Sequence, residues 1–125
     1  MGRDQSGWIW HMGAGLIILV LLGLHMAVMH LDGLLGWFNP AGGHPIDWAN
    51  VVARARSAFF MMTYVLLLGA ALFHGLYGLR GILFELSPAT SVQKAMDWAL
   101  VVGGLLLLVL GSWAAWANFA AAQAL

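Results

Sequence analysis

The chain has 125 residues, of which 62% are hydrophobic and only 8% charged, and its five Lys and Arg balance its five Asp and Glu. An ordinary soluble domain carries about 25% charged residues, so this composition predicts an integral membrane protein, and the zero net charge argues against a nucleic-acid partner. The lack of cysteine excludes disulfides, iron–sulfur clusters and thiolate metal sites within the chain, which leaves five histidines and seven methionines as candidate ligands.

Three apolar runs predict an all-α fold of three transmembrane helices in a single membrane domain, residues 1–125. The spans are expected at about 8–31, 57–86 and 92–119, and each supplies the roughly 20 apolar residues that a crossing helix needs. The first run is longer than the core of about 7–15 residues in a cleaved signal peptide, so it is expected to be a retained span. Close helix packing is expected at three glycines of the third span: Gly103, Gly104 and Gly111.

The segment 32–56 is predicted to be an outer loop that contains a short amphipathic helix. Its first part is rich in Gly, Pro and Asn, and such irregular backbone cannot face lipid. From Asp47 onward, apolar residues recur at helical spacing: Trp48, Val51, Val52 and Ala55. Thr90 and Gln93 have the spacing of a capping box for the third span. Positive residues favour an inside N-terminus, with three on its side against two on the other (Arg3, Arg80 and Lys94 against Arg54 and Arg56).

His74 is the strongest functional candidate, because a histidine within a membrane span is costly unless something binds it or hydrogen-bonds it. On a helix its face is shared by Ala71, Gly78 and Gly81, which would leave the clearance that a flat macrocycle such as haem needs. His74 is therefore interpreted either as a haem ligand or as a polar side chain bonded to a neighbouring helix, and the small residues favour the ligand. Arg80 lies about 9 Å further along the axis, where it could meet haem propionates or simply snorkel to the membrane edge.

The other histidines are weaker candidates. His25, deep in the first span, is either the ligand of a second haem or a structural residue, and we expect it at a different depth from His74. His11 is expected near the inner interface, where it could bond a propionate or a quinone oxygen, or be structural. His30 is expected at the interface and His44 has no assigned role. No second histidine is expected at the depth of His74, so a haem there would need a ligand from another chain.

The acidic residues do not form a catalytic set. Glu85 lies at the predicted inner end of the second span, where it could handle protons at a quinone site or merely mark the end of the helix. The sequence contains no paired carboxylates, no nucleophile–base arrangement and no glycine-rich phosphate loop. The chain alone therefore has no equipment for hydrolysis, phosphoryl transfer or hydride chemistry.

The second span carries a recognisable string: His74-x-x-x-Gly78-x-Arg80, with Glu85 eleven positions after the histidine. This string resembles the second span of the membrane-anchor subunits of succinate:quinone oxidoreductases, the succinate dehydrogenase and fumarate reductase family. Residues 23–30 (Gly-Leu-His-Met-Ala-Val-Met-His) resemble a first-span stretch of the two-haem branch. The chain departs from the family where Met12-Gly13-Ala14-Gly15 replaces a frequent Arg-x-Ser-Gly, and where Glu85 and Leu86 replace a usual Asp and a frequent Tyr.

The resemblance implies that His74 is an axial ligand of a b-type haem near the inner side, and that His25 ligates a second haem near the outer side. A second anchor subunit would supply the other ligand of each haem and complete the bundle. Electrons from succinate would pass through a flavoprotein and an iron–sulfur subunit to menaquinone or ubiquinone, at the cytoplasmic membrane of a prokaryote, while the chemistry at carbon occurs in another chain. The alternatives are a diheme b-type cytochrome of another quinone-linked dehydrogenase and a haem-free structural or assembly protein.

Overall fold

The computed structural model describes the backbone of residues 3–31, 36, 42–86 and 88–125, and side chains from Ser6 onward. The elements in chain order are α1 (Arg3–Met26), the π-helix η1 (Ala27–Leu31), α3 (Trp48–Ala55), α4 (Ala58–Glu85) and α5 (Thr90–Gln123). No strand occurs among the described residues, so the predicted all-α class is confirmed. Three stretches are long and apolar enough to cross a membrane (Ser6–Leu31, Ala58–Glu85 and Thr90–Gln123), as expected of an integral membrane protein.

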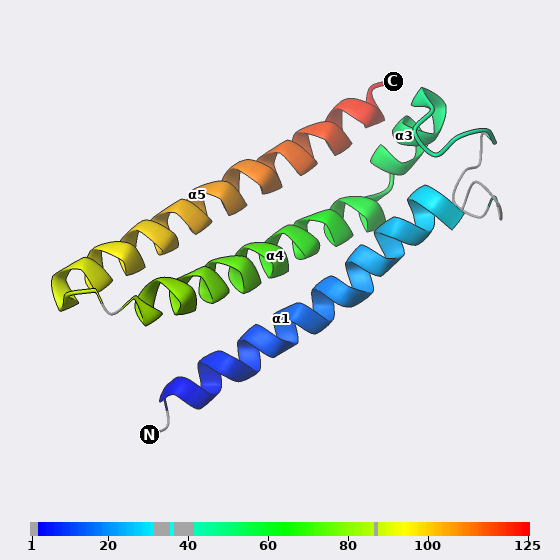
Figure 1. Ribbon diagram of the computed structural model, residues 1–125. Coiled ribbons are helices and arrows are strands. Elements are labelled where there is room, and N and C mark those ends of the chain that lie inside the picture. The colour runs from blue at the N-terminus through cyan, green and yellow to red at the C-terminus, as the bar shows by residue number, and fades with distance from the viewer. Residues whose placement is uncertain (1–2, 32–35, 37–41, 87) are drawn as a thin grey trace.

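The three long helices form one layer with α4 in the middle (Figure 1). α4 packs against both α1 and α5, whereas no contact joins the described parts of α1 and α5. Neighbouring helices run antiparallel, so the N-terminus and the α4–α5 connection lie at one end and α3 and the C-terminus at the other. None of the residues of α4 is buried, although it is the central helix. Both broad faces of the layer are therefore open to lipid or to further helices.

Two of the three glycines predicted at helix contacts set the distance between α4 and α5. A Cβ built on Gly104 would lie 2.6 Å from Cδ1 of Leu76, and one on Gly111 would overlap Leu68. Gly103 points elsewhere, because no described atom lies within 4 Å of its Cβ position. The missing side chains at Gly104 and Gly111 let the backbones approach closely, as small residues do in membrane helix pairs.

The short helix α3 buries two polar side chains, whereas only part of the predicted apolar stripe is exposed: Trp48 and Val51 are exposed, and Val52 and Ala55 are half-buried. Asn50 is fully buried and Arg54 is 7% exposed, while Trp48 is 72% exposed. The buried donors close the preceding loop: Asn50 Nδ2 bonds the carbonyls of Gly42 (2.8 Å) and His44 (3.1 Å), and Arg54 bonds that of Pro45. The exposed Trp48 is thus free to enter the membrane interface.

The helix ends differ from the predicted ones where polar or alanine-rich residues continue a helix. α1 already begins at Arg3, and α5 continues to Gln123. The expected capping box is wrong: α5 starts at Thr90 itself, after an N-cap at Ala89 with no side-chain hydrogen bond. Gln93 instead donates to the carbonyl of Pro88 at 3.0 Å. At the other end of the layer, Arg56 donates to the carbonyl of Ala122 (2.9 Å), and Gln123 donates to that of Arg56 (2.9 Å). These two bonds tie the start of α4 to the end of α5.

Candidate functional site

His74 faces α1, and its ring is hydrogen-bonded to the backbone of that helix. Nδ1 of His74 lies 3.1 Å from the carbonyl oxygen of His11. A carbonyl can only accept, so Nδ1 carries a proton, and in the neutral imidazole the lone pair is then on Nε2. This arrangement is the one that metal-ligating histidines adopt, because the bonded N–H fixes the tautomer and the ring orientation.

The ring of His11 lies flat against the ring of His74. Their centroids are 4.1 Å apart and the planes differ by 8°. The prediction that no second histidine lies at the depth of His74 is therefore wrong. That prediction placed His11 at the membrane edge, but α1 begins at Arg3, so His11 lies about two turns into the helix. Parallel rings in contact leave no room for a metal ion between them, so His11 and His74 would not hold one metal ion from opposite sides.

Tyr77 completes this cluster on α4. Its ring is tilted against that of His11 at 5.1 Å and stacked against Phe73 at 5.7 Å. Its hydroxyl lies against Gly7 of α1, where a Cβ would approach it to 2.5 Å. Nδ1 of His11 is buried and has no hydrogen-bond partner among the described residues. His11 is thus held through its ring faces rather than through this nitrogen.

The small residues around His74 divide between two surroundings. Gly78 does not offer free ground, since a Cβ there would lie 3.6 Å from Cε1 of His11. No described atom lies within 4 Å of the Cβ positions of Gly75 or Gly81, and Ala71 is exposed. The open clearance beside His74 is therefore provided by Ala71 and Gly75, and Gly81 lies about two turns after His74.

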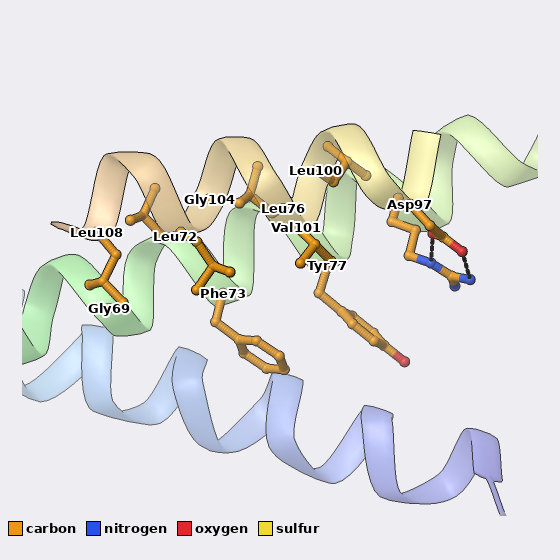
Figure 2. A pocket seen from close by; sticks show the side chains of 12 residues that line it. Gly69, Leu72, Phe73, Leu76, Tyr77, Asp97, Leu100, Val101, Gly104 and Leu108 are labelled. Atoms are coloured by element: carbon orange, nitrogen blue, oxygen red, sulfur yellow. Dashed lines mark hydrogen bonds and ion pairs between the residues drawn. The ribbon is translucent and has the colours of Figure 1, made fainter. Parts of the chain in front are cut away.

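Arg80 is directed toward α5, where it forms an ion pair with Asp97. Its Nε donates to Oδ1 at 2.6 Å and its Nη2 to Oδ2 at 3.1 Å, and its guanidinium lies 4.1 Å from the centroid of the Phe84 ring. The ion pair forms one end of an apolar groove of about 510 Å³ between α4 and α5 (Figure 2). The other end of the groove lies near Gly69 and Leu108. The predicted contact of Arg80 with propionates stays a prediction.

The remaining candidates lie apart from this cluster. His25 packs edge-on against Tyr64 of α4, with centroids 6.2 Å apart. Tyr64 lies ten residues before His74, or about 15 Å along the helix, so the two histidines are at different depths. Glu85 is the exposed last residue of α4, and His30 is exposed in η1. No group of three or more His, Cys, Asp or Glu that could hold a metal ion occurs in the described part of the chain.

Two residues of the site were not singled out from the sequence. Tyr77 stands three positions after His74, a spacing that places it on the adjoining part of the same helix face. Asp97 lies seven residues after Thr90 on α5, and Arg80 lies five residues before the end of α4. In an antiparallel hairpin these positions differ in height by only two residues, so the sequence alone could have indicated the Arg80–Asp97 pair.

These features define a three-helix integral membrane protein that carries a hydrogen-bonded intramembrane histidine. The chain is 28% identical over 108 residues to a succinate dehydrogenase hydrophobic membrane anchor subunit of Archaeoglobus fulgidus, covering 86% of this chain and 85% of the relative. It is 23% identical over 99 residues to the protein of the same name from Thermoplasma acidophilum, covering 78% and 73%. The predicted resemblance to succinate dehydrogenase anchor subunits is therefore confirmed. No family model matches the chain, and no solved structure matches it.

Proposed function

We propose that this chain is a membrane-anchor subunit of a succinate:quinone oxidoreductase and that His74 ligates a b-type haem. The curated relatives support the anchor role. The observation that carries the haem assignment is the hydrogen bond from Nδ1 of His74 to the His11 carbonyl, which leaves Nε2 available. When bound, the haem supplies one-electron transfer.

The residues present fit one axial ligand of a haem. A single imidazole with an oriented lone pair provides the donor, and the exposed Ala71 and Gly75 provide flat ground beside it. A second anchor subunit supplies the opposite ligand in this proposal, because His11 is stacked on His74 and does not face it across an iron. The open faces of the helix layer offer that subunit a surface, since α4 has no buried residue.

The rest of the assembly follows from the anchor role. Its partners are a flavoprotein and an iron–sulfur subunit, which bring electrons from succinate to menaquinone or ubiquinone in the membrane. The chain itself binds no dicarboxylate. By their positions in the helices, three of the five basic residues lie toward the end with the N-terminus and the α4–α5 connection (Arg3, Arg80 and Lys94). The other two lie toward the opposite end, in and after α3 (Arg54 and Arg56). This asymmetry favours an N-terminus on the cytoplasmic side of the membrane, with the soluble subunits on the same side.

A reduced-minus-oxidised spectrum of the complex isolated from membranes tests the proposal. We expect a b-type absorbance band that is lost in His74→Ala and kept in His30→Ala, because His30 is exposed in η1. A native complex without this band would contradict the haem assignment and favour a haem-free anchor. Isolation without flavoprotein and iron–sulfur partners would contradict the anchor role itself.

A further inference from the structure

Three features of α1 meet the His74 ring: a backbone carbonyl, an aromatic ring and a glycine. The carbonyl and the ring belong to His11, and the glycine is Gly15. These positions are four residues apart and so share one face of the helix. We propose that His11 and Gly15 are positioning residues that fix the plane of the His74 imidazole for ligation. This inference rests on the proposed function.

The ring plane of a histidine needs an external constraint. Rotation about the Cβ–Cγ bond of histidine is broad and roughly two-fold, so a rotamer alone does not define the direction of the Nε2 lone pair. The hydrogen bond of Nδ1 fixes one edge of the His74 ring, and the parallel ring of His11 at 4.1 Å fixes the plane. Both constraints come from one residue of α1, so they move together with that helix.

Gly15 makes this approach possible. A Cβ at position 15 would lie 3.2 Å from Cε1 and 3.3 Å from Nδ1 of His74, closer than ordinary van der Waals contact. An alanine there would push the imidazole away from α1 and weaken the bond to the His11 carbonyl. Gly13 is the matched control, because no described atom lies within 4 Å of its Cβ position.

His11 acts through the face of its ring rather than through Nδ1. That nitrogen is buried and has no hydrogen-bond partner among the described residues, which is a cost to the fold. Phenylalanine at position 11 keeps an aromatic face between His74 and Tyr77 and removes the unpaired nitrogen. The backbone carbonyl that accepts from His74 is unchanged by any substitution at this position.

The test uses the intact complex with its haem, examined by EPR of the ferric state and by redox titration of the haem. The EPR g values of a low-spin ferric haem depend on the planes of its axial imidazoles, and the midpoint potential depends on the basicity of the ligand. We expect His11→Ala to retain haem with shifted g values and a shifted potential, and His11→Phe to return both toward the native values. Gly15→Ala should shift the g values, while Gly13→Ala should leave them native.

Native g values and potential in His11→Ala would overturn the inference, as would loss of haem in both His11→Ala and His11→Phe, which would make a ring nitrogen the important group. If His11→Ala does not assemble, equal g values in Gly15→Ala and Gly13→Ala would overturn it. His74→Ala separates the two proposals. Retention of haem in His74→Ala would contradict the ligand assignment. If His74→Ala loses haem but the His11 and Gly15 variants keep the native g values and potential, only the positioning role is contradicted.

Discussion

Arg80 of α4 donates two hydrogen bonds to the carboxylate of Asp97 of α5, with nitrogen–oxygen distances of 2.6 and 3.1 Å. The pair joins the ends of the two helices near their connection and closes one end of the groove between them. Such two-point geometry is typical of arginine with a carboxylate. Both side chains are partly exposed, at 42% and 40%, so solvent or headgroups screen part of the attraction.

Removing the arginine should cost more than removing the whole pair. Arg80→Gln leaves the Asp97 carboxylate without its guanidinium at the edge of an apolar groove. Because both side chains are partly exposed, we expect a modest loss of thermal stability, larger in this variant than in the double variant. Adding Asp97→Asn to Arg80→Gln should restore part of the loss, because no charge is then left alone. Thermal unfolding of the purified complex compares the native protein with the two single variants and the double variant. Additive effects of the two substitutions would show that the residues do not interact.

The glycines of α5 give a sharper test of the α4–α5 packing. Gly111→Val should destabilise the protein by about 1–3 kcal/mol, a typical cost of overpacking a close contact, because a side chain there meets Leu68. Gly103→Val is the control, with no described atom near its Cβ position, and should have little effect. The midpoint of denaturation in detergent compares them. Equal losses in both variants would argue against the observed helix contact.

The three long apolar helices could be predicted because their cause is local, whereas their arrangement with α4 in the middle was not predicted. Each apolar run is long enough to cross a membrane by itself, so the number and order of the spans follow from composition alone. The helix ends were less predictable. The interfacial tryptophan Trp8 suggested that the first span begins there, but α1 begins at Arg3. At the C-terminal end the alanine-rich residues beyond Phe119 continue α5, because alanine favours helix more than any other residue.

The partners of His74 could not be predicted in the same way. A helix that is apolar all round carries little information about which side faces which neighbour, so Gly78 looked like free ground when it lies against His11. The stack of His11 on His74 joins residues 63 positions apart, and only the packing of α1 on α4 reveals it. The choice of His74 itself needed no such information, because a histidine in an apolar run is conspicuous in any orientation.

The buried amide of Asn50 provides a prediction at the opposite end of the layer. Asn50→Leu removes two donors from the carbonyls of Gly42 and His44 and should cost about 1–3 kcal/mol, the usual penalty when buried polar groups lose their partner. Asp47→Asn keeps an oxygen to accept from the backbone N–H of His44 and should cost less. Urea or thermal unfolding in detergent separates the two variants. A larger loss in Asp47→Asn would contradict the bonding seen for Asn50.

His25 carries the proposal of a second haem, and the ratio of haem to flavin in the complex tests it. If the complex binds two haems, His25→Ala should leave one, and the surviving haem should keep the native spectrum of the His74 site. The reason is that His25 of α1 lies beside Tyr64, ten residues before His74 on α4. Tyr64→Phe keeps the ring that packs against His25 and loses only its hydroxyl, so both haems should remain. Full haem content in His25→Ala would make His25 a structural residue whose role is its edge-on contact with Tyr64.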